Sequence, residues 1–459
     1  MAPAIVELGL VLVVLWTSGL RTVSGLTLVT HLPGFDGRLP FELETGYIAV
    51  DELEEVNLFY YFVKSERSPA EDPLLLWVTG GPGCTGLTGL AYEFLTKTYE
   101  TRRLPSLIYR EESWTRISSI IFVDSPVGTG FSYSKAAEEN EWSDTKTSRR
   151  LGVFIRKWLV DHPEFISNPF YIAGDSYGGK LCPIVAQEVI NGNEAGAKPL
   201  GYLVGNPVTS EGRFDMGSKI PYSHGVGFIS DELYEATKAS CGGDYVTPRS
   251  VQCAKCLEAV ADNLKALNVE CTLEPLCVWS SPEPKHSPRE GRSLGEVERP
   301  HPLSLQILRD RSSPFGDLPA KSWANSDAVR EALGVRKGWT GDWVRCRGDI
   351  RTNRTIDIPS AVPYHLNVTR RGFRALVYSG DHDLFVNFLG TQAWLRSLNY
   401  SIVHDWRPWL VNGQAAGYTR TYANNLTFAT VKGAGHIATE YKPRECWDMF
   451  ERWISGQAL

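Results

Sequence analysis

The stretch Phe170-Tyr-Ile-Ala-Gly-Asp-Ser-Tyr-Gly178 joins a short apolar run to a Gly-x-Ser-x-Gly pattern. The run Phe170 to Ala173 predicts a buried strand, and Leu181 to Asn191 has helical character. A sharp turn from strand to helix forces its central residue into strained dihedrals, so flanking glycines avoid clashes and leave the Ser176 hydroxyl exposed. We therefore predict that Ser176 is a nucleophile; a purely structural turn is the alternative.

Similar apolar runs recur along the chain and end in glycine-rich or polar turns. They are Leu74–Trp77, Ile120–Val123, Tyr202–Val204, Ala375–Tyr378 and Phe428–Val431. Continuous apolar runs are typical of strands that are buried on both faces of a parallel sheet. A helical segment, Thr147 to Val160, follows the second of these runs. This alternation predicts an α/β fold with a mostly parallel central sheet.

A serine nucleophile needs an imidazole base and a carboxylate that orients the base. Asp381-His-Asp383 follows the run that ends at Tyr378, and His436 follows the run that ends at Val431. The resulting chain order of Ser, Asp and His is that of α/β-hydrolases. We select Asp383 over Asp381. We select His436 over His382, because a base inside the same turn as its own carboxylate would leave His436 unexplained.

The loop Thr79-Gly-Gly-Pro-Gly-Cys84 follows another of the predicted strands. A glycine-rich loop in this place could bind phosphate, but no Lys-Ser/Thr follows the glycines, which weakens that interpretation. In a serine hydrolase such a loop brings backbone N–H groups close to the developing oxyanion. We assign the oxyanion hole to the N–H groups of Gly81 and Tyr177.

The 459-residue chain has ordinary globular composition, with 42% hydrophobic residues, 22% charged residues and a net charge of −6. No net positive field is available to bind nucleic acid or an anionic membrane. The apolar run from Leu8 to about Leu20 predicts a signal peptide over residues 1–25, with a membrane anchor as the alternative. We therefore expect a protein of the secretory pathway, vacuolar or extracellular, that does not associate with membranes after the signal is removed.

Export would allow the cysteines to form disulfides and the glycosylation signals to be modified. The nine cysteines would enter an oxidising compartment, and Cys253-x-x-Cys256 without a nearby histidine is weak evidence for zinc, so we expect disulfides and no metal. An odd number leaves at least one thiol unpaired. Four Asn-x-Ser/Thr sequons fit a secreted glycoprotein; they begin at Asn353, Asn367, Asn399 and Asn425.

Two regions interrupt the alternation of strands and helices. Residues 209–279 lack strong strand runs and contain five of the cysteines, which predicts an inserted, disulfide-stapled helical cap. Residues 280–302 are rich in proline and charge, which predicts an exposed linker that could be excised. Residues 26–208 and 303–459 then form the two parts of the core.

The motifs together resemble the serine carboxypeptidase family from about Leu26 to the end of the chain. They are Trp77–Cys84, Ile121–Tyr133, Gly174–Gly178, Gly380–Asp383 and Gly433–His436. The neighbourhoods of His31–Asp36 to Tyr47 and of Trp394–Tyr400 to Thr419–Tyr422 resemble, more narrowly, the plant serine carboxypeptidase-like acyltransferases. Those proteins transfer acyl groups from acyl-glucose esters. The resemblance implies an α/β-hydrolase fold.

The resemblance also pairs Cys84 with Cys346. In the cap we expect Cys241 with Cys253 and Cys271 with Cys277, although Cys256 could replace a neighbour. Cys182, Cys256 and Cys446 would then remain thiols.

Two positions bear on the substrate. Family peptidases have Asn and Glu where this chain has Thr79 and Asp175, and they use those side chains to hold the free carboxylate of a peptide. Asp is one methylene shorter and Thr offers a single hydroxyl, so a bidentate hold should weaken. Both substitutions match the acyltransferase-like pattern. We include Trp77 with Thr79 and Asp175 as predicted substrate-binding residues.

Two further departures are Thr85, where the family usually has Ser, and Thr439, where it usually has Pro, and both affect loop rigidity.

The leading hypothesis is an acyltransferase without a cofactor. Ser176 attacks a 1-O-acyl-glucose ester, glucose leaves after protonation by His436, and an alcohol or amine acceptor takes the acyl group. A carboxypeptidase, in which water resolves the acyl-enzyme, is the second hypothesis. An inactive secreted binding protein with the same fold is the third. We expect small-molecule donor and acceptor partners, and a monomer or a two-chain form after cleavage of the linker.

Overall fold

The computed structural model describes residues 26–53, 55–98, 106–136, 142–192, 199–210, 212, 214–276 and 318–459. The predicted signal peptide, the predicted linker and Cys277 lie outside these residues. In the part of the chain that is described, no helix is both long and apolar enough to cross a bilayer.

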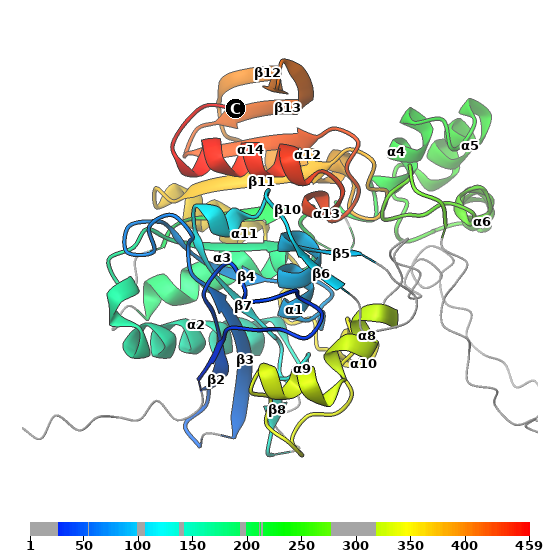
Figure 1. Ribbon diagram of the computed structural model, residues 1–459. Helices are drawn as coiled ribbons and strands as arrows, with labels where there is room; N and C mark the ends of the chain where they lie inside the picture. Colours follow the sequence, from blue (N-terminus) through cyan, green and yellow to red (C-terminus); the bar gives the residue numbers. More distant parts are fainter. Residues whose placement is uncertain are drawn as a thin grey trace, which may run out of the picture.

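One large sheet with a parallel centre and antiparallel edges organises the molecule (Figure 1). Its order is β1-β2-β3-β7-β4-β9-β10-β11-β14-β13-β12, and β8 pairs with β3. Neighbours are parallel from β7 to β14. The strands are β1 (Thr27–Val29), β2 (Leu43–Ala49), β3 (Val56–Val63), β4 (Leu74–Val78), β7 (Ser119–Val123), β8 (Tyr133–Ser134), β9 (Phe170–Asp175), β10 (Pro199–Gly205), β11 (Arg374–Gly380), β12 (Ile402–Val411), β13 (Gln414–Tyr422) and β14 (Leu426–Val431). Every apolar run that we expected to be a buried strand lies in the parallel part, which confirms the predicted fold class.

The parallel strands are mostly apolar because helices cover both faces of the sheet. Successive side chains of a strand point to opposite faces. Leu74 and Leu76 of β4 therefore pack into the cluster that contains residues of α2 and α3, whereas Leu75 and Trp77 pack into the cluster that contains residues of α14. The helices of the core are α1 (Gly86–Thr88), α2 (Asp144–Asp161), α3 (Gly178–Asn191), α8 (Leu318–Ala324), α9 (Asp327–Ala332), α10 (Gly348–Asn353), α11 (Val362–Arg370), α12 (Phe388–Ser397), α13 (Ala438–Tyr441) and α14 (Pro443–Ile454). A separate two-stranded sheet pairs β5 (Leu95–Thr98) with β6 (Ser106–Tyr109).

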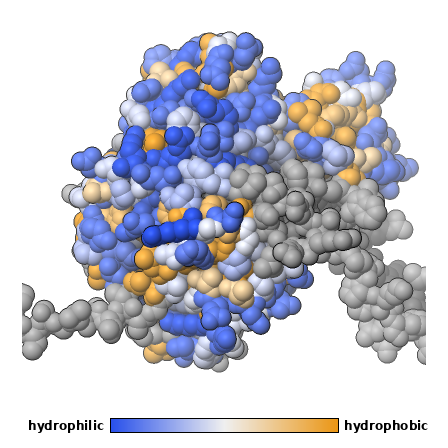
Figure 2. Space-filling view, in the orientation of Figure 1, coloured by the Kyte–Doolittle hydropathy of each residue, from blue (hydrophilic) through white to orange (hydrophobic). Residues whose placement is uncertain are grey.

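A helical cap projects from one side of the sheet (Figure 1). It consists of α4 (Lys219–Gly225), α5 (Asp231–Cys241) and α6 (Val251–Leu264), and these helices share a small hydrophobic cluster that also includes Leu384 of the core. Figure 2 shows apolar residues gathered over the cap on this face, whereas the surface over β12 and β13 is mostly hydrophilic. A cluster of this size gains additional support from a disulfide.

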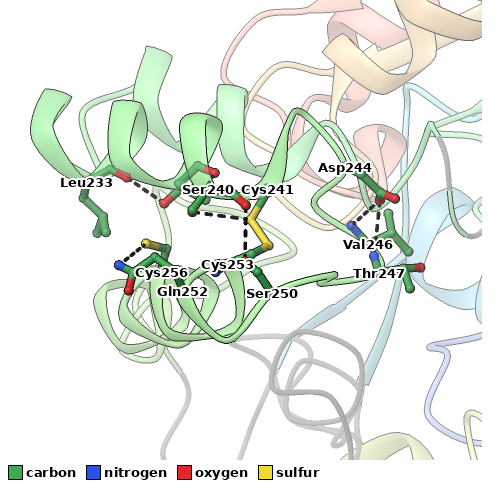
Figure 3. The surroundings of a disulfide bond; sticks show 11 residues. Leu233, Ser240, Cys241, Asp244, Val246, Thr247, Ser250, Gln252, Cys253 and Cys256 are labelled. Carbon is green, nitrogen blue, oxygen red and sulfur yellow. Dashed lines mark hydrogen bonds between the residues drawn. A yellow bond between two sulfur atoms is a disulfide. The ribbon is translucent and has the colours of Figure 1, made fainter.

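Two of the predicted disulfides are present. Cys241 at the end of α5 is bonded to Cys253 in the first turn of α6, so the two helices lie side by side (Figure 3). Cys84 is bonded to Cys346, as the family resemblance implies. The third prediction differs from the structure: Cys271 is a free, buried thiol, and its expected partner Cys277 lies outside the described residues.

The four sequons occupy different environments. Asn353 ends α10, and Asn399 and Asn425 lie in turns with positive φ; all three are exposed. Asn367 lies within α11 and is only partly exposed, and its amide donates to Gln187 Oε1 at 2.6 Å. Glycosylation remains a prediction, and we expect it at the three exposed positions rather than at Asn367.

Candidate active site

Ser176 occupies a tight turn between β9 and α3. It is a non-glycine residue with a φ of 51°, and the Ser176 N–H donates to Gly205 O at 2.9 Å. A Cβ on Gly178 would lie 2.0 Å from Val78 O, so only glycine lets the end of β4 approach this turn. The strained backbone and the required glycine are what the Gly-x-Ser-x-Gly pattern predicts.

A continuous chain of hydrogen bonds joins Ser176, His436 and Asp383. His436 Nε2 lies 2.8 Å from Ser176 Oγ, and His436 Nδ1 lies 2.8 Å from Asp383 Oδ2. Burial lowers the pKa of His436, but the Asp383 charge, with smaller contributions from Glu270 and Asp175, outweighs this effect and raises it overall. The arrangement can therefore move a proton from the serine hydroxyl to the imidazole.

Asn206 supports Asp383, and sequence reasoning missed it. Its Nδ2 donates to Asp383 Oδ2 at 2.8 Å, while its Oδ1 accepts from the Gly380 N–H at 3.1 Å. The other Asp383 oxygen accepts from the N–H groups of Phe385 and Val386 at 2.7 and 3.1 Å. The available signal was a polar residue directly after the buried strand β10, at the edge where the other candidate residues lie.

The rejected alternatives lie nearby but take other partners. Asp381 Oδ1 accepts from the Gly433 N–H at 2.7 Å, and His382 Nδ1 lies 3.2 Å from Thr272 Oγ1. Both side chains are partly exposed, whereas Asp383 is fully buried. This geometry agrees with the selection of Asp383 and His436.

The glycine loop after β4 lies directly against the serine turn. A Cβ on Gly80 would lie 2.5 Å from Ser176 Cβ and 2.9 Å from Tyr177 N. Within the described residues, neither the Gly81 N–H nor the Tyr177 N–H donates to another backbone or side-chain group. The disulfide at Cys84 and the hydrogen bond from Thr85 N to Arg345 O, 2.9 Å long, attach this loop to the second part of the core. The two N–H groups are thus available to an oxyanion.

The predicted substrate-binding residues divide into two groups. Thr79 and Asp175 line the cavity beside Ser176. Asp175 Oδ1 accepts from the Gly80 N–H at 3.0 Å, and burial raises the pKa of Asp175 to about 6, although the proximity of His436 opposes that rise. Thr79 Oγ1 is buried and has no hydrogen-bond partner in the described part of the chain.

Trp77 does not line the cavity, so its predicted contact with substrate is wrong for this structure. The side chain is fully buried, and its ring meets the Trp114 ring edge to face at 5.8 Å between centroids. The reason is the alternation of β4, which turns Trp77 into the core beneath the sheet while the loop that follows reaches the site.

The cavity also contains charged residues that no motif identified. Glu270, Arg345 and Glu440 line it together with Ser176 and His436. Arg345 lies 3.8 Å from Glu440, and both side chains are largely buried. Burial raises the pKa of Glu270, which the positive charges of His436 and Arg345 partly oppose. The lining as a whole contains acidic and basic residues in equal number, with Asp175, Glu270 and Glu440 against Arg345, Arg347 and Arg351.

The cap reaches the site through a short segment, Asn268–Thr272, which we call the strap. Its backbone binds both loops that hold the candidate base and its carboxylate. Val269 O accepts from the N–H groups of Leu384 and Phe385, both at 3.0 Å, and Glu270 O accepts from the His436 N–H at 2.6 Å. The cap is thus a structural support of the site.

The fold and the site together define an α/β-hydrolase with a Ser-His-Asp hydrogen-bond chain. Residues 33–456 match the model of the serine carboxypeptidase family. The chain belongs to this family.

Relatives and solved structures agree with the family. The chain is 48% identical to serine carboxypeptidase-like 5 of Arabidopsis thaliana, with 95% of this chain and 94% of that protein covered. It is also 48% identical to serine carboxypeptidase-like 2 of the same plant, over 95% and 94% of the two chains. The crystal structure of Kex1, a prohormone-processing carboxypeptidase from Saccharomyces cerevisiae, superposes with a TM-score of 0.70, covering 92% of this chain and 94% of that chain. At 18% identity this likeness concerns the fold alone.

Proposed function

We propose that the protein is an acyltransferase that moves an acyl group from a 1-O-acyl-glucose ester to an alcohol or amine acceptor. Ser176 is the nucleophile, His436 is the general base and acid, and Asp383 orients the imidazole. The N–H groups of Gly81 and Tyr177 stabilise the tetrahedral oxyanion. The reaction uses no cofactor.

The proton follows the hydrogen-bond chain in both half-reactions. In the first, His436 takes the Ser176 proton as the oxygen attacks the ester carbonyl, then gives a proton to the departing glucose oxygen. In the second, His436 takes the proton of the acceptor, which attacks the acyl-enzyme and restores the Ser176 hydroxyl. Water in place of the acceptor gives hydrolysis, so positioning of the acceptor decides the product.

The observation that carries the proposal is the hydrogen bond between Asp175 Oδ1 and the Gly80 N–H. A carboxypeptidase must hold the free carboxylate of its peptide, and a carboxyl group committed to the glycine loop is poorly placed for that role. A neutral sugar or alcohol needs no such hold on a carboxylate.

Carboxypeptidase activity is the alternative, favoured by Arg345 in the cavity wall, since arginine binds carboxylates well. Its ion pair with Glu440 offsets much of that charge. The test supplies purified protein with a panel of 1-O-acyl-glucose esters, with and without acceptors, and measures glucose release and acylated product. Blocked dipeptides are assayed in parallel, with Ser176→Ala as the control. Efficient release of C-terminal residues, without product from any donor, would establish the peptidase instead.

A double variant sharpens this choice. Thr79→Asn with Asp175→Glu restores the side chains that family peptidases use, so hydrolysis of blocked dipeptides should rise relative to acyl transfer, by roughly tenfold for one or two recovered hydrogen bonds. The measurement is the ratio of kcat/KM for the two substrates. An unchanged ratio would mean that these positions do not set the substrate class.

We also propose a secretory-pathway location, vacuolar or extracellular, for a monomer or a two-chain form. This rests on the sequence signals and needs fractionation of cells that express the full chain.

A further inference from the structure

A buried ion pair lies behind the serine turn, away from the cavity. Lys180 Nζ is 2.9 Å from Asp144 Oδ2, and both side chains are 1% exposed. The Tyr177 hydroxyl donates to Asp144 Oδ1, and Lys180 Nζ also lies 3.4 Å from the Tyr177 hydroxyl oxygen. The side chain of Tyr177 therefore ends in a fixed charged cluster, while its backbone nitrogen lies against Gly80 of the glycine loop.

Arg354 holds the same side chain from a third direction. Its Nε donates to the Tyr177 hydroxyl oxygen at 3.2 Å, and its guanidinium carbon lies 5.0 Å from the centre of the tyrosine ring. Lys180 Nζ lies 5.1 Å from the same centre. Both distances allow cation–π attraction. Tyr177 is thus attached to α2, to the first turn of α3 and to the segment after α10.

Asp144 is itself well anchored. It is the first residue of α2, where the helix dipole favours a negative charge. The Asp144 N–H donates to Asp357 Oδ1 at 2.9 Å, and the Thr145 N–H donates to the same oxygen at 3.2 Å. Burial, together with the Asp144 charge, raises the pKa of Tyr177 well above its ordinary value, so the hydroxyl stays protonated and remains a donor.

Stability alone is a weak reason for this arrangement. The desolvation of two buried charges often offsets their attraction, and well-packed apolar side chains can replace such a pair without loss. The oxyanion donor, in contrast, must lie within a few tenths of an ångström of its best position, because its effect depends on preorganisation. The preceding residue has a strained positive φ, so the turn needs an external constraint to stay in place.

We propose that Asp144 and Lys180 are positioning residues that act through the tyrosine side chain to fix the Tyr177 N–H in the oxyanion hole. The inference rests on the proposed role of that N–H, but not on the identity of the acyl donor or acceptor. It applies equally to acyl transfer and to hydrolysis.

The test uses Tyr177→Phe, which removes the hydroxyl but keeps the backbone N–H, together with Asp144→Asn and the double variant Asp144→Leu/Lys180→Met. Hydrolysis of a p-nitrophenyl ester gives kcat and KM, and a boronic acid that forms a tetrahedral adduct with serine gives an inhibition constant. Loss of a whole oxyanion donor costs about 10²- to 10³-fold in kcat, so a displaced donor should cost about 10- to 100-fold. We expect this loss in kcat, an equal rise in the inhibition constant, and a KM within about twofold of the wild type, a conventional margin for unchanged binding.

The matched control is Glu44→Gln. Glu44 Oε1 lies 3.0 Å from His162 Nε2 in another largely buried pair, remote from the cavity. This variant should lose stability but keep kcat and the inhibition constant. The proposal is overturned if Tyr177→Phe and the double variant fold and retain the wild-type kcat, or if their loss is confined to the melting temperature or to KM. Failure of a fluorophosphonate to label Ser176 in the wild type would instead reject the nucleophile and, with it, the proposal.

Discussion

The two sides of the cavity are built in different ways. On the core side, the Gly80 loop and the Ser176 turn touch backbone to backbone, with no room for an added Cβ. On the cap side, the strap reaches the loops of Asp383 and His436 through backbone carbonyls, while the Glu270 side chain is left to line the cavity. The core side packs the glycine loop tightly against Ser176, whereas the cap side supports the Asp383 and His436 loops through its main chain and adds Glu270 to the cavity lining.

This difference indicates on which side of the cavity amino-acid substitutions should be tolerated. The core side depends on distances that only glycine permits, so substitutions there affect folding and chemistry together. The strap depends on main-chain hydrogen bonds, which most side chains can accompany. The following predictions test this contrast, beginning with the largest expected effect.

Ser176→Ala should abolish the chemical step while the fold stays intact. Loss of the nucleophile of a Ser-His-Asp group costs on the order of 10⁶-fold in kcat, and removing a small hydroxyl leaves the packing unchanged. The measurements are turnover of an activated ester and the melting temperature. His436→Ala should give a similar loss, and the double variant should be scarcely worse because the residues act as a unit. Activity above a tenth of the wild type would reject the assignment.

Gly178→Ala should destabilise the whole molecule. The new Cβ would lie 2.0 Å from Val78 O, so β4 or α3 must move, and overpacking of this kind costs about 1–3 kcal/mol or more in the free energy of unfolding. Gly225→Ala in the cap is the matched control, since nothing lies within 4 Å of its added Cβ. Urea unfolding compares the two variants. Equal stabilities would contradict the proposed tight contact.

Asn268→Ala should loosen the strap. Asn268 Oδ1 accepts from the N–H groups of Glu270 and Cys271 at 3.1 and 3.3 Å, and leaving these groups unpaired costs about 1–3 kcal/mol. We expect a modest fall in kcat, because the strap supports the His436 loop, and faster hydrogen exchange at residues 268–272. Asn263→Ala, on the exposed surface of α6, should change neither quantity. A strap variant with wild-type exchange rates would argue against this support.

Glu270→Gln should give the smallest effect, a shift of the acid limb of the pH profile. The base must be neutral to accept the serine proton, so activity falls as pH drops through the pKa of His436. The negative charge of Glu270 raises that pKa, and its removal lowers it, so kcat/KM should persist to lower pH. Glu274→Gln, outside the cavity lining, serves as the control. A limb that stays in place, or moves to higher pH, would contradict this assignment.

The centre of the fold could be predicted because its strands consist mostly of apolar residues. Strands buried on both faces, such as β4 and the first part of β9, form continuous apolar runs, and this pattern is visible in the sequence. Strand β12 was missed because it lies at the sheet edge, where seven of its ten residues are exposed and leave no continuous apolar run. Strand β3 is fully buried and apolar apart from Asn57, but no glycine-rich or catalytic motif follows it.

The site divides in the same way. Ser176, Asp383 and His436 stand next to glycine-containing turns at strand ends, so local context identifies them. Glu270 lies in a segment with no local signature, and the only signal for Asn206 is its polar position directly after β10, so the folded chain is needed to place both at the site. The interpretation of Trp77 failed because proximity in sequence to the glycine loop does not determine to which face of the strand a side chain points.

The backbone character of the strap has a consequence for how this architecture can diversify. Val269 and Glu270 support the loops of Asp383 and His436 through their carbonyl oxygens, so this support depends little on which side chains stand at the two positions. The side chain at position 270 can thus change during evolution, and with it the cavity lining, while the loops that hold His436 and Asp383 keep their positions. If the cap were exchanged between relatives with this main-chain contact retained, the substrate preference should change while the geometry of Ser176, His436 and Asp383 stays the same.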